Sequence, residues 1–130
     1  MKQKNIVLEV KSVTTSCEEV CRIHEHIPFN EERIDKIADK LGAISNPTRL
    51  KIILLAMKYG EITTCELENA LSLSQSKVSY HLLNLLNADI VDRRTYGPWS
   101  FYRVKDKAEI SNMFRVIGTD KSELQSLIMD

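Results

Sequence analysis

The spacing of apolar residues predicts a helix from Asn30 to Ile44. Asn30 suits the N-cap, and the acidic residues at positions 31 and 32 stand in the first turn, where the helix dipole favours negative charge. Gly42 stands near the predicted end. The apolar side chains recur every three or four positions, which places them on one helix face. They are Ile34, Ile37, Ala38 and Leu41.

A second helix is predicted from Asn46-Pro47 to Tyr59-Gly60. Asn46 suits the N-cap, and Pro47 suits the first helical position, where no backbone N–H is missed. Its apolar residues cover most of the circumference, so we expect this helix to be central and buried on most sides. Leu50, Ile53, Leu54 and Met57 form the predicted inward stripe, and Ile52, Leu55 and Ala56 widen it.

Two short helices joined by a tight turn follow, which is the pattern of a helix-turn-helix. Thr63 and Glu66 have the spacing of a capping box and predict the start of the first short helix. Residues 72–74 turn the chain, and the second short helix is predicted from about Gln75 to Ala88. Its inward residues are Val78, Leu82, Leu85 and Leu86.

After Asp89 the pattern changes from helical spacing to alternation, which predicts two strands at 90–95 and 99–104. They flank Tyr96-Gly97-Pro98 and form a hairpin, or wing. A helix is predicted from Asp106 to Ile117, and a short polar helix toward Met129. The expected fold class is therefore mostly α with a β-hairpin wing, a winged helix-turn-helix.

Residues 1–29 are expected to form a flexible N-terminal arm that carries Cys17 and Cys21, whereas 30–130 form one winged helix-turn-helix domain. No apolar run approaches the ~20 residues that span a bilayer. The N-terminus also lacks a signal-peptide cleavage pattern. We therefore expect a cytoplasmic protein without a membrane partner.

No cysteine stands beside a catalytic His/Asp pattern, and no glycine-rich loop is present to hold a phosphate. We therefore expect no enzyme activity and no organic cofactor.

The distribution of charge favours a DNA-binding surface, although the chain has 18 basic and 18 acidic residues and no net charge. Residues 74–105 contain five basic residues against two acidic ones. Polar side chains on the outer face of a helix can reach base edges in the major groove, and hairpin arginines suit phosphate or minor-groove contact. The alternative is a solvated helix face. The predicted DNA contacts are Gln75, Ser76, Lys77, Ser79, Tyr80, Arg93, Arg94 and Arg103.

Three cysteines form a candidate metal site. Cys17 and Cys21 are four positions apart and share one face of a helical turn, and Cys65 falls in the first turn of the helix-turn-helix. Thiolates bind soft, thiophilic ions, so Cd(II), Pb(II) and As(III) fit, as does Zn(II) with a fourth ligand. A thiol switch that senses oxidation and a purely structural role for the cysteines are the alternatives.

Three ordered stretches resemble the ArsR/SmtB family of metal-responsive winged-helix repressors, and the resemblance runs from about Cys17 to Ile117. The stretches are 43–52 (AISNPTRLKI), 73–82 (LSQSKVSYHL) and 92–104 (DRRTYGPWSFYRV). The resemblance implies a homodimer, paired through its first and last long helices, that represses a promoter on double-stranded operator DNA until an inducer binds. It also supports the contacts at positions 75, 76, 79 and 80, where family contacts fall.

The cysteines resemble those of the cadmium/lead-sensing CadC-type members, in which an arm with Cys-x3-Cys combines with cysteine at the start of the first motif helix. In the family the arm can reach the other subunit. Thr63 replaces one cysteine common in those sensors, so the fourth thiolate is missing. His24 or His26 is either a further ligand or an exposed loop histidine. The other family site, on the last long helix, lacks a histidine, so we expect no metal there.

Overall fold

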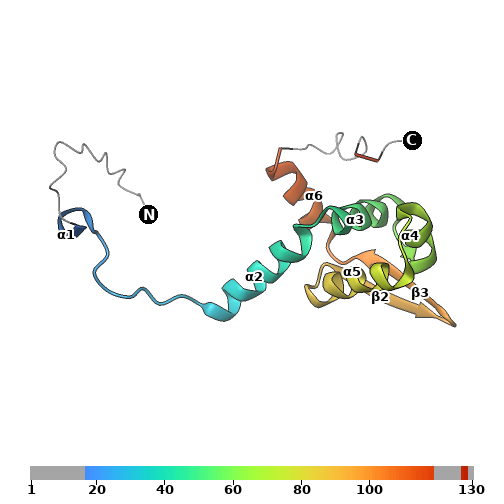
Figure 1. Ribbon diagram of the computed structural model, residues 1–130, viewed down its shortest axis with the longest axis horizontal. Coiled ribbons are helices and arrows are strands. Elements are labelled where there is room, and N and C mark those ends of the chain that lie inside the picture. Colours follow the sequence, from blue (N-terminus) through green and yellow to red (C-terminus); the bar gives the residue numbers. More distant parts are fainter. Residues whose placement is uncertain (1–16, 119–126, 129–130) are drawn as a thin grey trace. The chain divides into compact units, whose positions relative to one another are not determined.

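The computed structural model describes residues 17–118 and 127–128, and the chain divides into two units, Met1–Asn30 and Glu31–Asp130 (Figure 1). In the first unit the described segment contains one helix, α1 (Cys17–Val20), followed by chain without regular secondary structure. That residues 1–29 act as a flexible arm stays a prediction. The predicted polar helix toward Met129 lies almost wholly outside the described residues.

The second unit is a winged helix-turn-helix, which confirms the predicted fold class (Figure 1). Its helices and strands are α2 (Glu31–Ile44), α3 (Pro47–Tyr59), β1 (Ile62–Thr63), α4 (Thr64–Leu71), α5 (Gln75–Asn87), β2 (Val91–Tyr96), β3 (Trp99–Val104) and α6 (Lys107–Val116). Helices α4 and α5 are the helix-turn-helix, and β2 and β3 are the wing.

Side-chain caps fix the starts of the helices, as the sequence predicts for α3 and α4. The Asn46 side chain accepts a hydrogen bond from the backbone N–H of Arg49 at 3.0 Å. The Thr63 hydroxyl accepts from the N–H of Glu66 at 3.2 Å and donates to the Glu66 carboxylate at 2.9 Å. Ser74 caps α5 in the same manner. These bonds satisfy N–H groups that have no partner within a helix.

The sheet has the order β1-β3-β2, with both pairs antiparallel. Gly97 begins the two-residue turn of the hairpin with a φ of 57°, a conformation that glycine adopts without strain. Strand β1 was not predicted, because two residues are too short to show alternation. It pairs Ile62 with Tyr102 and thereby anchors the start of α4 to the wing.

The core lies between α3, α5 and the inner part of the wing. Helix α3 contributes Ile52, Ile53 and Ala56, which are fully buried. The predicted stripe of α3 is therefore partly wrong, because Leu50, Leu54 and Met57 are only half-buried at the edge of the core. The remaining core residues include Ile62, Leu67, Val78, Leu82, Leu85, Ile90, Val91, Val104, Ile110 and Phe114.

Helix α2 leaves most of its apolar stripe exposed. Ala43 is its one buried residue, whereas Leu41 is 60% exposed. In α6, the last described helix along the chain, Val116 is 83% exposed. The Lys40 ammonium pairs with the Glu109 carboxylate at 2.7 Å and joins α2 to α6. Among the described residues, no helix is long and apolar enough to cross a membrane.

Candidate nucleic-acid interface and metal ligands

The outer face of α5 carries the side chains predicted to contact DNA. Gln75, Ser76, Lys77, Ser79 and Tyr80 are all exposed. They are exposed because the apolar residues one turn apart, Val78, Leu82 and Leu85, turn the opposite face into the core. The result is a short polar helix surface of the kind that fits the major groove.

Sequence reasoning missed one residue of this face. Leu83 lies one turn beyond Ser79 and Tyr80 and is 56% exposed. Its helical spacing from Ser79 was the available signal, since residues four apart lie on the same side of a helix. An exposed leucine here offers an apolar surface of the kind that contacts a thymine methyl group.

The three wing arginines have different surroundings. Arg93 is exposed, and its side chain has no partner within the described part of the chain. The Arg94 guanidinium donates two hydrogen bonds to the Glu61 carboxylate, at 3.0 and 2.8 Å, and lies 4.9 Å from the Phe101 ring centre. Arg103 lies 3.9 Å from the Asp92 carboxylate on the facing strand. Only Arg93 is thus unpaired, and the DNA contacts of all three stay predictions.

The pair formed by Arg94 and Glu61 perturbs both groups. The hydrogen bond from Arg94 is the main reason that the pKa of Glu61 lies below its ordinary value. The same hydrogen bond raises the pKa of Arg94. Both charges are therefore present at neutral pH, and Arg94 is held against the sheet.

His81 is half-buried on the side of α5 that faces α3. Its Nδ1 lies 3.2 Å from Nη1 of Arg49, and its ring meets the Tyr80 ring edge-on at 5.2 Å between centres. Burial is the main cause that lowers the pKa of His81, and the positive charge of Arg49 lowers it further. A neutral imidazole that accepts a hydrogen bond from Arg49 explains why this histidine is tolerated near the core.

The candidate metal ligands belong to both units of the chain. Cys17 begins α1 and Cys21 follows its last residue, in the first unit. Cys65 stands in the first turn of α4, in the second unit. Cys21 and Cys65 are exposed free thiols. The Cys21 thiol donates to the carbonyl oxygen of Ile23 at 3.0 Å, and the Asn69 amide lies 3.9 Å from the Cys65 sulfur.

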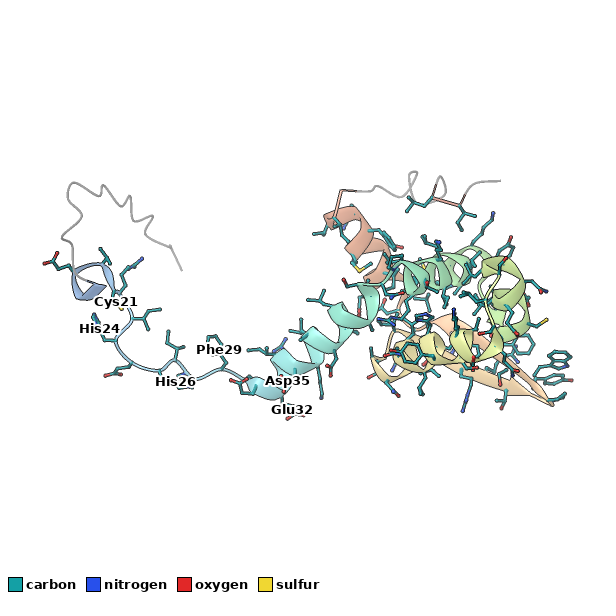
Figure 2. The ribbon with its side chains drawn as sticks, in the orientation of Figure 1. Cys21, His24, His26, Phe29, Glu32 and Asp35 are labelled. Atoms are coloured by element: carbon teal, nitrogen blue, oxygen red, sulfur yellow. The ribbon has the colours of Figure 1, made fainter. Side chains whose placement is uncertain are left out.

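The two histidines near Cys21 are exposed. Figure 2 shows His24 and His26 along the segment that follows α1, where each projects from extended chain. In the part of the chain that the structure describes, no three His, Cys, Asp or Glu side chains are gathered as a preformed metal site. On α6, Asp106 caps the helix and Glu109 pairs with Lys40.

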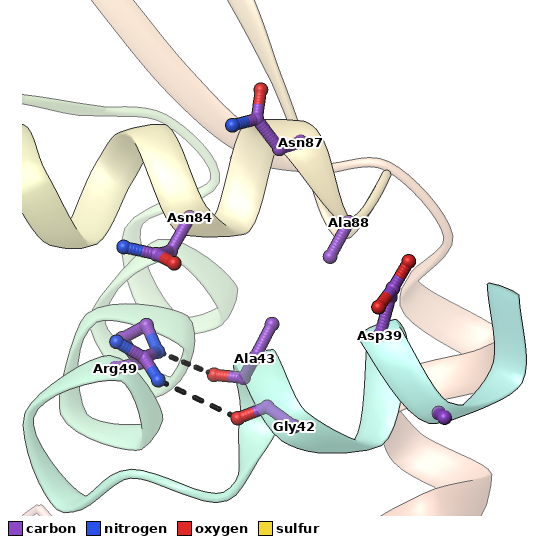
Figure 3. A pocket seen from close by; sticks show the side chains of 8 residues that line it. Asp39, Gly42, Ala43, Arg49, Asn84, Asn87 and Ala88 are labelled. Carbon is purple, nitrogen blue, oxygen red and sulfur yellow. Dashed lines mark hydrogen bonds between the residues drawn. The ribbon is translucent and has the colours of Figure 1, made fainter. Parts of the chain in front are cut away.

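A pocket of about 340 Å³ opens where the end of α2 meets α3 and α5 (Figure 3). Arg49 forms part of its wall and donates hydrogen bonds to the carbonyl oxygens of Ala43 at 2.6 Å and Gly42 at 3.4 Å. The pocket is lined by Ala38, Asp39, Gly42, Ala43, Arg49, Asn84, Asn87 and Ala88.

Comparisons with known proteins place this geometry among bacterial regulators. Residues 46–93 match the family model described as "Bacterial regulatory protein, arsR family". The arsenical resistance operon repressor of Bacillus subtilis is 34% identical over 76 residues, which are 58% of this chain and 72% of that protein.

Solved structures give the same result for the fold. HlyU from Vibrio cholerae, in its reduced form, superposes with a TM-score of 0.57 at 29% identity, over 68% of this chain and 96% of that one. A homodimeric winged helix-turn-helix DNA-binding domain from Mycobacterium bovis superposes with a TM-score of 0.62 at 18% identity, over 83% of this chain and 94% of that one. At that identity it supports the fold alone.

Proposed function

The chain belongs to the arsR family of bacterial regulatory proteins, and from this premise we propose that it is a homodimeric repressor that binds operator DNA and is released by a thiophilic ion. Its relatives and structural neighbours are regulators rather than enzymes, in agreement with the expectation that the chain is not an enzyme.

The exposed polar face of α5 is the observation that carries the proposal. Gln75, Ser76, Ser79 and Tyr80 are free to approach bases, since the helix is anchored through its opposite face. Arg93 on the adjacent strand β2 supplies an unpaired cation for a phosphate. Base contacts and backbone contacts thus come from consecutive elements of one compact unit.

The exposed apolar residues of α2 and α6 support a homodimer. Ile34, Ile37 and Leu41 form a stripe on α2 that the described chain leaves uncovered, and Val116 and Ile117 are exposed at the end of α6. Contiguous apolar surface of this kind marks an interaction site in small proteins. A second copy buries it symmetrically, which also presents two α5 helices to two half-sites.

The cysteines support release by a soft ion. Cys21 and Cys65 are exposed thiols that can release their protons to solvent and bind a metal as thiolates, and Cys17 supplies the third sulfur of the proposed set. Three thiolates suit As(III), Cd(II) and Pb(II), whereas Zn(II) takes a fourth ligand. Among these ions, the name of the Bacillus relative favours As(III), whereas the arm pattern resembles the cadmium/lead sensors.

The ion would act by linkage. When bound, it supplies a crosslink between the arm thiolates and the thiolate at the start of the helix-turn-helix. If the crosslinked dimer holds its α5 helices at the wrong spacing for the operator, then the ion weakens DNA binding by the same factor by which DNA weakens ion binding.

Fluorescence anisotropy tests this proposal. The probe is a labelled duplex that the wild-type protein enriches from a random library, titrated with and without As(III), Cd(II), Pb(II) and Zn(II). We expect one or more ions to release the duplex from wild-type protein, and Cys65→Ser to bind it and resist release. If the oxidant diamide releases the duplex but no ion does, the inducing signal is thiol oxidation rather than metal binding. Failure of wild-type protein to enrich any duplex from the random library would refute the repressor itself.

A further inference from the structure

Arg49 stands at the junction of three helices and bonds to two of them (Figure 3). It lies in the first turn of α3, where its backbone N–H donates to the Asn46 cap at 3.0 Å. Its Nε donates to the Ala43 carbonyl oxygen at 2.6 Å and its Nη2 to the Gly42 carbonyl oxygen at 3.4 Å. Its Nη1 lies 3.2 Å from Nδ1 of His81 on α5.

The Arg49 guanidinium donates hydrogen bonds to free carbonyl groups in the last turn of α2. The last four carbonyl groups of a helix have no partner within it. In α2 the backbone satisfies the outer two, since the N–H of Ser45 donates to Leu41 at 2.9 Å and that of Asn46 to Ile44 at 2.7 Å. The Arg49 guanidinium donates hydrogen bonds to the two carbonyl groups between them, those of Gly42 and Ala43.

The same group reaches the proposed DNA-reading helix. His81 lies between Leu82, which is buried, and Tyr80, which is on the outer face and meets the His81 ring edge-on. A planar guanidinium can donate in several fixed directions at once, which an ammonium group does not reproduce. A continuous chain of contacts thus runs from the end of α2 through Arg49 and His81 to Tyr80.

We propose that Arg49 is a positioning residue that holds α5 at a defined orientation relative to the end of α2, the helix that carries the apolar dimer stripe. The inference rests on the proposed DNA binding through α5. In a dimer, the distance between the two reading helices depends on how each is fixed to its dimer helix. Arg49 therefore sets operator affinity without touching DNA.

The test compares Arg49→Met, which keeps much of the aliphatic stem and removes the donors, with Lys51→Met on the same turn of α3. Lys51 is exposed, so Lys51→Met removes one positive charge, as Arg49→Met does, without breaking a described contact. We expect Arg49→Met to weaken binding to the enriched duplex about tenfold, the order of a lost hydrogen bond to a charged group. Lys51→Met is expected to leave the preference for the enriched duplex over poly(dI-dC) unchanged, whereas Arg49→Met reduces it.

The salt dependence separates positioning from direct contact. Each phosphate contact that is lost reduces the magnitude of the negative slope of log K against log salt by about 0.9. We expect Arg49→Met to weaken specific binding with an unchanged slope. A slope reduced by about one unit would identify Arg49 as a phosphate contact and overturn the proposal, as would unchanged affinity.

A second variant keeps the test decisive if Arg49→Met fails to fold. His81→Leu leaves the bonds from Arg49 to Gly42 and Ala43 in place and removes only the link to α5. We expect the same loss of specific binding from a folded dimer. Where Arg49→Met does fold, combining the two substitutions should cause no additional loss. Full affinity in His81→Leu would overturn the inference. Failure of the proposed function is distinguishable, because wild-type protein would then enrich no duplex from the random library.

Discussion

The Arg94 guanidinium donates two hydrogen bonds to the Glu61 carboxylate, at 3.0 and 2.8 Å, and so links the wing to the residue that precedes β1. The two residues are 33 positions apart in the chain. The neighbouring Arg93 side chain has no such partner within the described residues. Two adjacent arginines on one strand are therefore expected to differ in what they do.

Substitution of the two arginines tests this difference. We expect Arg93→Ala to weaken DNA binding. The slope of log K against log salt should become less negative by about 0.9, because the substitution removes one phosphate contact. Arg94→Ala should change the slope less. Its effect on the free energy of unfolding should be small, since exposed ion pairs contribute little to stability. The two variants carry the same loss of charge and serve as controls for each other, and equal slopes would contradict the assignment.

The contrast between these arginines shows where sequence reasoning succeeds and where it stops. The caps at Asn46 and Thr63 and the outward face of α5 follow from local spacing, so the pattern predicts them. The partner of Arg94 depends on β1, a strand too short to leave a pattern, and on the register of the sheet. The contacts of Arg49 likewise join segments that only the tertiary fold brings together.

The cysteines illustrate a second limit. Spacing predicts that Cys17 and Cys21 share one helical turn and that Cys65 stands at the start of α4. In the structure Cys65 stands in the first turn of α4, whereas α1 ends at Val20 and Cys21 follows it. Cys17 and Cys21 belong to one unit of the chain and Cys65 to the other, so local spacing within either unit does not predict whether all three bind one ion.

The depressed pKa of His81 predicts a loss of stability on acidification. Burial, and then the charge of Arg49, disfavour the imidazolium in the folded state, so the unfolded chain binds the proton more readily. Stability is therefore complete above the unfolded pKa of about 6.5 and falls as the pH drops through that value toward the lower folded pKa.

Two measurements check the His81 prediction. Chemical denaturation at several pH values should show that wild-type protein loses more stability below pH of about 6.5 than His81→Gln, which cannot titrate there. The imidazole signal of His81 followed by NMR should titrate at higher pH in Arg49→Met than in wild-type protein, since one depressing charge is gone. A His81 pKa at or above its ordinary value would contradict the description of this contact.

The apolar stripe of α2 predicts that a single polar substitution weakens the proposed dimer without unfolding the protein. Leu41 is 60% exposed in the single chain, so Leu41→Gln should leave the fold intact. Burial of one leucine contributes roughly 1.5–3 kcal/mol, so the dissociation constant of the dimer should rise at least about tenfold. Sedimentation measures this, with Lys36→Gln as the control, because Lys36 is on the same helix and highly exposed. An unchanged dimer would exclude Leu41 from the interface.

Leu83 and Leu85 separate the two faces of α5 most directly, because they are the same residue type two positions apart. Leu85 is 0% exposed, and Leu85→Ala should lower the free energy of unfolding by about 2–5 kcal/mol through lost burial and a cavity. Leu83 is 56% exposed, and Leu83→Ala should change stability by no more than about 0.5 kcal/mol. If α5 enters the major groove, Leu83→Ala should weaken the enriched duplex more than poly(dI-dC), since only base contacts carry sequence preference. Equal weakening of both DNAs, or none, would show that the base-reading part of α5 ends before Leu83.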